Sequence, residues 1–361
     1  MFQLQQIELV QFRNYSNQKF QFNENIIGIC GTNGLGKTNL LDAIYYLSFS
    51  KSYFSRTDLS NVQHQLQGFR LSADYLLQSK NINTTCILRE NNKKEFLFNN
   101  EEYNKLSEHI GKLPCVMIAP DDVELINGAA DLRRKFIDVL ISQINKNYLA
   151  AIIKYNQLLL QRNSVLKNQE KEFYDTLFSV ITDQLVESGN YIFKTRNDFL
   201  KIFIPKIISN YQAIAETNDD LECIYQSQLI KNEFASLLKI NKRNDFALQR
   251  TTVGTHKDDI EFSMGDYKFK TIASQGQKKS LLFALKLSEW QTLLEQKGFY
   301  PILLLDDVFE KLDDNRMKNL LSMVSQNDDA QIFITDTHKN RLTEQLQNLN
   351  RPFQIIELSS N

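Results

Sequence analysis

The sequence predicts an α/β fold in which one sheet domain is split along the chain by an inserted all-helical arm. Short strand-like runs dominate residues 1–120, and helical spacing dominates residues 121–245. Strand-like runs return over residues 246–361. Because strands occur on both sides of the helical block, we interpret the first and third regions as two parts of one domain.

The strand signals are short and bounded by turn residues. IIGIC at 26–30 is a compact apolar run, typical of a buried parallel strand. The turn pairs Asn99-Asn100 and Gly265-Asp266 predict tight hairpins. The other predicted strands are FRLSADYLL at 69–77, TTCILRE at 84–90, KEFLFNNEEY at 94–103, DDIEFSMGDYKFK at 258–270 and AQIFITDTH at 330–338.

The helical block has one proline, Pro205, and long stretches with a helical period. In YLAAIIKYNQLLLQRNSVLK at 148–167, the spacing predicts one apolar face. That predicted face consists of Leu149, Ile152, Ile153 and Asn156, followed by Leu159 and Leu160.

The composition limits the classes of protein. With 42% hydrophobic and 24% charged residues, the chain resembles a soluble globular protein, and its formal net charge of -1 means that any DNA-binding surface is local. The four scattered cysteines form no CxxC pair, which argues against a zinc ribbon or a disulfide framework. We find no signal peptide and no apolar run long enough to span a bilayer, and therefore expect a cytoplasmic protein.

A glycine-rich stretch follows the first buried strand. Residues 31–38 read GTNGLGKT and fit the phosphate-loop pattern G-x-x-x-x-G-K-[ST] between a strand and a helix. Lys37 would reach the β- and γ-phosphates of ATP, and the Thr38 hydroxyl would ligate Mg²⁺. The alternative is a glycine-rich turn that binds nothing. The predicted nucleotide-binding residues are Gly31, Thr32, Asn33, Gly34, Leu35, Gly36, Lys37 and Thr38.

A second element supplies carboxylates. Four apolar residues at 302–305 lead directly into Asp306 and Asp307. A carboxylate at the end of a buried parallel strand suits a Mg²⁺ partner, so we predict that Asp306 is a metal ligand. Asp307 would orient or deprotonate the water that attacks the γ-phosphate, and with Lys37 it is the predicted catalytic pair. The alternative is that Asp307 only caps the next turn.

A third element is the helix that begins in TIASQGQKKSLLFALKLSEW at 271–290. Its predicted buried stripe is Phe283, Leu287, Trp290 and Leu294. Ser274 and Gln277 form a capping box, and the exposed N–H groups around Gly276 suit an anion. The alternative is an ordinary capped core helix. We refer to residues 274–279 as the signature segment.

Together these motifs resemble the ATPase heads of ATP-binding-cassette and SMC-like proteins, and more closely the RecF family of bacterial DNA-gap repair. The resemblance runs almost end to end, and the signature segment with RRKFID and DDVF is its most specific part. The matching stretches are QFRNY at 11–15, residues 31–48, KSYFSRTD at 51–58, residues 119–138, QRNSVLK at 161–167, TTVGTHKDD at 251–259, SQGQKK at 274–279 and LLLDDVFEKLD at 303–313.

The resemblance implies a discontinuous ATPase lobe I with a helical lobe II. It implies ATP with Mg²⁺, nucleotide contacts from Arg13 and Asn39, and a signature segment (Ser274, Gly276, Gln277) that closes over ATP held by a second copy. It further implies an ATP-dependent homodimer with weak, DNA-stimulated ATPase activity that acts as a clamp or switch. Such proteins bind gapped, junction and single-stranded DNA, load RecA with RecO and RecR, and support replication restart and the SOS response.

Two stretches depart from the family pattern. The family usually has Pro and Arg where this chain has Gly254-Thr255-His256-Lys257, so an Arg-specific contact there is in doubt. The last predicted buried strand ends in Thr335-Asp336-Thr337-His338. His338 is either a sensor of the γ-phosphate or a structural histidine.

Other functions fit less well. A transport-type ATPase subunit would carry an LSGGQ-type signature, whereas this chain reads ASQGQ at 273–277. A DNA-end-processing enzyme would need a nuclease domain, for which no length remains, and a scaffold with a dead site would lack the phosphate-loop and carboxylate residues. The candidate DNA contacts, which are equally interpretable as solvated or core side chains, are Lys51, Tyr53, Phe54, Arg56, Arg133, Arg134, Lys135, Lys278 and Lys279.

Overall fold

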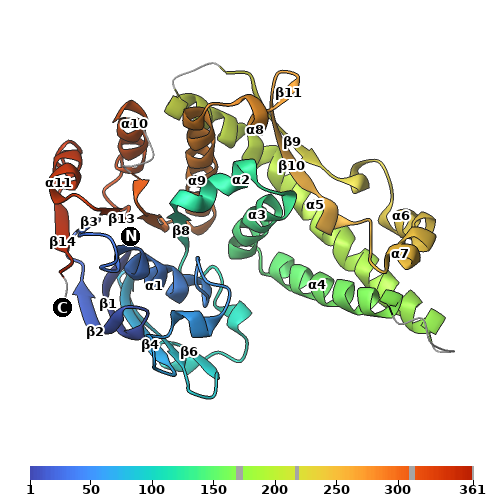
Figure 1. The fold of residues 1–361 in the computed structure, drawn as a ribbon, viewed down its shortest axis with the longest axis horizontal. Coiled ribbons are helices and arrows are strands. Elements are labelled where there is room, and N and C mark those ends of the chain that lie inside the picture. The colour runs from blue at the N-terminus through green and yellow to red at the C-terminus, as the bar shows by residue number, and fades with distance from the viewer. Residues whose placement is uncertain (168–173, 216–218, 309–313, 360–361) are drawn as a thin grey trace. The chain divides into compact units, whose positions relative to one another are not determined.

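The computed structural model describes residues 1–167, 174–215, 219–308 and 314–359, so the end of the LLLDDVFEKLD match, residues 309–313, lies outside the described residues. The chain forms two compact units (Figure 1). The first unit comprises Met1–Val123, Ala213–Glu216 and Gln275–Asn361, and the second comprises Glu124–Gln212 and Thr217–Ser274. The first unit is therefore assembled from segments that lie on both sides of the second in sequence.

A five-stranded parallel sheet forms the centre of the first unit. Its strand order is β14-β3-β13-β12-β8, and every residue of β3, β8, β12 and β13 is buried, as parallel strands covered on both faces require. The predicted strand IIGIC is β3, and the strand before the paired aspartates is β12. The bounds are β3 Ile26–Cys30, β8 Cys115–Ile118, β12 Ile302–Leu305, β13 Ile332–Asp336 and β14 Phe353–Glu357.

An antiparallel sheet completes the first unit, with the order β2-β1-β4-β5-β6-β7. Here the side chains of β1 and β4 alternate between buried and more exposed, because one face packs inward. The predicted Asn-Asn turn joins β6 to β7, with both asparagines at positive φ. The bounds are β1 Phe2–Phe12, β2 Tyr15–Gln21, β4 Phe69–Leu77, β5 Lys80–Leu88, β6 Lys94–Phe98 and β7 Glu101–Glu102.

Two helices of the first unit are buried almost all round. Helix α1, Lys37–Phe49, contacts strands of both sheets, and helix α9, Gln275–Lys297, packs on β8. Three residues of the predicted buried stripe on α9, Phe283, Leu287 and Trp290, are buried, and Leu294 is only partly so. Burial is not confined to a stripe, because every residue from Ser280 to Trp290 is buried. A helix enclosed on all sides shows no clean amphipathic stripe. The remaining helices of this unit are α10 Asp314–Val324 and α11 Lys339–Gln347.

The second unit is mainly helical but contains a three-stranded antiparallel sheet of order β11-β10-β9. This differs from the all-helical arm predicted over residues 121–245, since β9 lies inside that range and the unit extends to Ser274. The hairpin turning at Gly265-Asp266 is present, but its strand β10 pairs with β9 of the same unit. The bounds are α2 Glu124–Asn127, α3 Ala130–Ile144, α4 Lys146–Lys167, α5 Tyr174–Ala215, β9 Leu221–Gln226, α6 Phe234–Ile240, α7 Lys242–Leu248, β10 Asp259–Met264, β11 Tyr267–Lys268 and α8 Phe269–Ile272.

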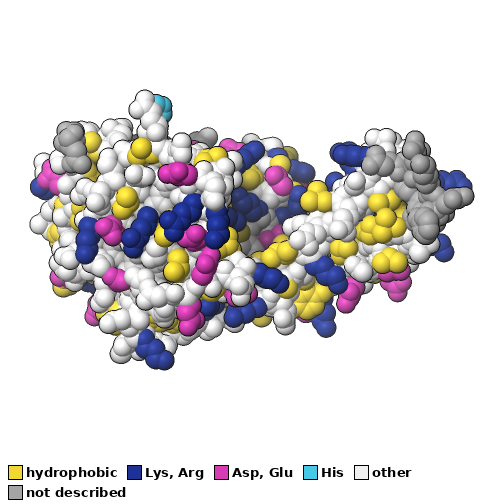
Figure 2. Space-filling view, turned by 90° about the horizontal axis from the view of Figure 1, so that it is seen from below, with side chains coloured by type: hydrophobic (Ala, Val, Ile, Leu, Met, Phe, Trp, Pro, Cys, Tyr) yellow, Lys and Arg dark blue, Asp and Glu magenta, His cyan; other side chains and the backbone are white. Residues whose placement is uncertain are grey.

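Helix α4 buries a different face from the one predicted. Its buried residues are Tyr148, Tyr155, Leu158, Arg162 and Leu166. Ile153 and Leu160 are instead 40% and 71% exposed, and Figure 2 shows hydrophobic side chains on the surface of this unit. The prediction assigned aliphatic residues to the interior, but here the interior holds tyrosines and an arginine whose polar atoms find partners there.

Among the described residues, no helix is both long and apolar enough to cross a membrane.

Candidate nucleotide site

The phosphate loop lies between β3 and α1, as the pattern predicts. Gly36 has a φ of 104°, and a Cβ there would lie 2.6 Å from the Asn14 side chain and 2.9 Å from the Tyr15 hydroxyl oxygen. The Tyr15 hydroxyl donates to the Gly36 carbonyl at 3.1 Å, and the Asn14 amide donates to the Leu35 carbonyl at 3.0 Å. Only glycine fits this left-handed, closely covered position, which leads into the first turn of α1.

Lys37 is 5% exposed and lies folded against its own loop. Its ammonium donates to the carbonyl of Gly31 at 2.6 Å and to that of Thr32 at 3.3 Å. No ion pair among the described residues includes Lys37. The Asp306 carboxylate acts on this ammonium electrostatically, but not as a direct ion pair. A buried ammonium whose hydrogen bonds go to carbonyls suits an incoming anion.

The two predicted metal ligands meet. The Thr38 hydroxyl lies 3.0 Å from each carboxylate oxygen of Asp306, although the two residues are 268 positions apart. Thr335, at the end of the neighbouring strand β13, donates a further hydrogen bond to Asp306 at 2.9 Å. Burial raises the pKa of Asp306 to about 6, against the lowering effect of the Thr335 and Thr38 hydrogen bonds. A hydroxyl and a carboxylate in this arrangement fit the oxygen ligands that Mg²⁺ prefers.

Asp307 occupies a strained backbone position beside this pair. Its φ is 47°, in the left-handed region, and its N–H donates to the Thr335 hydroxyl at 2.9 Å. Such strain in a non-glycine residue is typical of functional sites. Thr335 therefore fixes both aspartates, a role that the sequence analysis missed, although its place at the end of a buried parallel strand was a usable signal.

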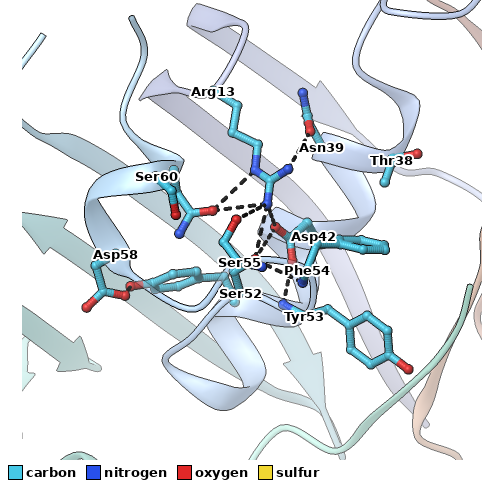
Figure 3. A network of polar contacts seen from close by, with 12 residues as sticks. Arg13, Thr38, Asn39, Asp42, Ser52, Tyr53, Phe54, Ser55, Asp58 and Ser60 are labelled. Carbon is cyan, nitrogen blue, oxygen red and sulfur yellow. Dashed lines mark hydrogen bonds and ion pairs between the residues drawn. The ribbon is translucent and has the colours of Figure 1, made fainter. Parts of the chain in front are cut away.

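Arg13 lies at the centre of a polar network (Figure 3). Its guanidinium donates to Asn39 at 3.1 Å and to Asp42 at 2.6 Å, and its backbone has a φ of 53°. Asn39 directly follows Thr38, so Arg13 contacts the phosphate-loop helix through this side chain. The guanidinium also donates to Ser52, Ser55 and Asn61. Asp42 was not predicted; it is 0% exposed, and burial raises its pKa while Arg13 lowers it.

The signature segment leads into α9. Ser274 is exposed and immediately precedes the helix, whose first residue is Gln275 and which continues through Gly276 and Gln277. A Cβ on Gly276 would lie 2.0 Å from a guanidinium nitrogen of Arg316, on α10. Glycine at this position therefore allows an arginine side chain to lie directly on the first turn of α9, another contact that the sequence did not reveal.

Hydrogen bonds fix the two stretches that depart from the family pattern. His338 is exposed and occupies the N-cap position of α11, and its N–H donates to Asp336 at 2.8 Å. In the loop 254–257, His256 contacts the Tyr155 hydroxyl at 2.7 Å and the Thr251 carbonyl at 3.1 Å. Burial lowers the pKa of His256 to about 4, so it is neutral near pH 7.

The candidate DNA contacts separate into two groups. Arg133 is buried and makes two hydrogen bonds with Asp259, at 2.7 and 2.9 Å, while Arg134 donates to the Asp258 carbonyl at 2.6 Å. Tyr53 also forms hydrogen bonds within the protein, with Asp42 and Lys286. The exposed candidates are Lys51, Phe54, Arg56 and Lys135, with Lys278 and Lys279 partly exposed.

The phosphate loop, the Thr38–Asp306 pair and the covered parallel sheet define the ATPase head of a P-loop protein. Residues 3–357 match the family model described as the RecF/RecN/SMC N terminal domain. The chain is 38% identical over 355 residues to the DNA replication and repair protein RecF of Phocaeicola vulgatus, covering 98% of this chain and 95% of that one. It is 37% identical over 357 residues to that of Flavobacterium johnsoniae, covering 98% and 99%.

Comparison with solved structures gives the same family as the sequence comparisons. The fold is similar to a solved structure of the recombination mediator protein RecF-ATP in the RecFOR pathway, with a TM-score of 0.87, 31% identity and coverage of 94% and 92%. The chain therefore belongs to the RecF/RecN/SMC family and, within it, to the RecF proteins. An Smc head bound to a ScpA domain, at 14% identity, a TM-score of 0.56 and coverage of 99% and 95%, shares the fold alone.

Proposed function

We propose that this chain is an ATP-dependent DNA-binding protein of recombinational repair, which binds ATP with Mg²⁺ and closes as a homodimer on gapped or junction DNA. The observation that carries the proposal is the convergence of Lys37, Thr38, Asp306 and Asp307 at one edge of the parallel sheet. The similarity to a RecF-ATP structure supports the choice of nucleotide.

Each residue of the site has a distinct role. Lys37 leaves the carbonyls of Gly31 and Thr32 and binds the β- and γ-phosphates. Thr38 and Asp306 would hold Mg²⁺, which neutralises the phosphate charge when bound. Asp307 accepts the proton of the attacking water. The phosphate loop, with Asn39 and the Arg13 network behind it, holds the nucleotide in place.

Dimer closure would complete the site. In a two-fold dimer, the signature segment of one copy, with Ser274, Gly276 and Gln277, faces the γ-phosphate held by the other. Closure then depends on ATP, and hydrolysis, which we propose is slow and stimulated by DNA, reopens the dimer. In this role the protein works with RecO and RecR in loading RecA at single-strand gaps, and so supports replication restart and the SOS response in the cytoplasm.

The test is to size the protein with and without ATP, Mg²⁺ and gapped DNA. We expect a monomer alone, a dimer with ATP, and ATP-dependent DNA binding that weakens steeply with salt because phosphate contacts release counterions. Ser274→Arg should bind ATP as a monomer but fail to dimerise. A dimer that forms without ATP, or equal DNA affinity with and without ATP at several salt concentrations, would contradict the proposal.

A further inference from the structure

A buried polar cluster in the first unit borders the Arg13 network of the nucleotide site. It consists of Tyr53, Asp122, Lys286 and Glu289, and we call it the Lys286 cluster. Lys286 and Glu289 lie in the middle of α9, the helix that carries the signature segment, and each is 4% exposed. The cluster therefore places charge inside the hydrophobic core, where an unpaired charge is costly.

Tyr53 has hydrogen bonds at both of its ends. Its backbone N–H donates to Asp42 of α1 at 2.7 Å. Its hydroxyl donates to Asp122, which follows β8, and accepts from the Lys286 ammonium at 3.1 Å. In Figure 3 the Tyr53 ring points away from the Arg13 guanidinium. The hydrogen bonds of Tyr53 therefore reach from Asp42 on the phosphate-loop helix to Lys286 on α9. One residue thus contacts elements that carry two different nucleotide motifs.

Asp122 extends the same connection to the strand that carries the paired aspartates. Its carboxylate accepts from the Ala119 N–H at 2.9 Å. The neighbouring Ile118 carbonyl, at the end of β8, accepts from the Asp306 N–H at 2.9 Å. Tyr53 and Asp122 therefore lie where the phosphate-loop helix, the strand before Asp306 and the signature helix meet.

Charge fixes Lys286 in this position. Its ammonium lies 3.6 Å from Asp122 and 3.9 Å from Glu289, and 5.4 Å from the centre of the Tyr53 ring. Burial raises the pKa of Glu289 to about 7, while the nearby Lys286 ammonium acts to lower it. A buried cation held by the Tyr53 hydroxyl and by two carboxylates has little freedom to move independently of them.

We propose that Tyr53 is a positioning residue that couples the phosphate-loop helix α1 to the signature helix α9 within one chain. When phosphate enters the loop, a shift of α1 displaces Asp42 and the Tyr53 backbone, and the Tyr53 hydroxyl transmits it to Lys286. ATP bound in one copy then shifts α9 of the same copy, the helix whose signature segment faces the partner. This inference rests on the proposed function in assigning α9 that role.

The experiment is hydrogen–deuterium exchange on the intact protein, at a concentration where sizing shows monomer, with and without a non-hydrolysable ATP analogue and Mg²⁺. In the wild type, the analogue should slow exchange in residues 31–39 and in the first turns of α9. In Tyr53→Phe, protection of residues 31–39 should remain, while the response of α9 falls by about fivefold or more, the low end of coupling between sites.

Tyr75→Phe is the matched control, because Tyr75 is a buried tyrosine of the same unit whose hydroxyl has no hydrogen-bond partner in the described part of the chain. It should respond like the wild type. If Tyr53→Phe fails to fold, Asp122→Asn, which removes the carboxylate from the same junction, provides the readout. An α9 that does not respond in the wild type, or responds equally in Tyr53→Phe, would overturn the coupling. Failure of the wild type to dimerise with ATP would instead contradict the proposed function.

Discussion

Each unit buries a cation in its polar interior, and the two cations are neutralised in different ways. In the second unit, Arg162 is 0% exposed and contacts Asp245 at 2.8 Å and the Thr251 hydroxyl at 2.7 Å. In the first unit, Lys37 is almost as buried, but its partners are the carbonyls of Gly31 and Thr32.

This difference separates a structural network from a binding site. The charge of Arg162 is met by a carboxylate of the same chain, so the network is complete without a ligand. Among the described residues, the Lys37 ammonium donates only to carbonyls, and the Asp306 carboxylate acts on it without a direct ion pair. A phosphate can replace those carbonyls at a gain in free energy. The residue type alone does not make the distinction; the chemistry of the partner does.

The largest expected effect concerns the candidate nucleotide site, where Lys37 lies. Asp307→Asn removes the group that we propose accepts the proton of the attacking water but leaves the Asp306 carboxylate and Lys37 in place. We expect hydrolysis to fall by about 10²- to 10⁴-fold, the usual contribution of a general base, with ATP affinity retained and the ATP-bound dimer longer-lived. Single-turnover hydrolysis and sizing measure both, and a normal rate would make Asp307 a structural residue.

The Arg162→Met substitution tests whether the buried Arg162–Asp245 pair stabilises the second unit. Removing the arginine leaves Asp245 buried without its cation, which should cost about 3–5 kcal/mol of the free energy of unfolding. ATP affinity should not change. The control is Arg162→Met with Asp245→Leu, which removes both charges and should recover most of the loss. If the single variant unfolds at the wild-type denaturant midpoint, the pair is not a structural element.

The sequence predicted those features that depend on neighbouring residues. The turn between Gly31 and Gly36, the strands β4 and β12, and the hairpin at Gly265 follow from glycine conformation and short hydrophobic patterns, which act over a few residues. The pairing of Thr38 with Asp306 was also predictable, because parallel strands bring their carboxyl ends to one edge of the sheet.

The features that the sequence did not predict depend on distant partners. β10 belongs to the second unit because it pairs with β9, and no local signal records that pairing. Helix α4 buries Arg162 because this side chain forms an ion pair with Asp245. As a result, α4 buries a different face from the one that its aliphatic residues predicted. The sequence suggested that Arg133 is a basic surface residue, but its guanidinium forms an ion pair with Asp259.

A smaller effect concerns a buried histidine of the first unit. His109 is 0% exposed, contacts the Leu47 carbonyl at 2.7 Å, and has a pKa lowered by burial to about 4. Because its pKa is lower in the folded than in the unfolded state, stability is full above pH 6.5 and is lost as the pH falls toward 4. The loss at pH 5.5 is about 1.4 kcal/mol.

Denaturation at a series of pH values measures this loss. His109→Gln, which cannot gain a proton, should flatten the dependence between pH 6.5 and 4 and remove the loss of about 1.4 kcal/mol at pH 5.5. Should the slope persist unchanged in this variant, the pH dependence arises from other groups, of which His256 in the second unit is the next to test.

The measurement that tests the central claim most directly is the thermal stability of Lys37→Met with and without ATP and Mg²⁺, alongside Lys286→Met. Both lysines are buried in the first unit, but among the described residues Lys286 forms ion pairs with carboxylates and Lys37 forms none. Without ATP, Lys37→Met should be as stable as the wild type, whereas Lys286→Met should be less stable. ATP at about 100 times the wild-type Kd should stabilise the wild type and Lys286→Met by about 2.7 kcal/mol and leave Lys37→Met unchanged. A Lys37→Met protein that is destabilised without ATP yet still stabilised by it would contradict the account.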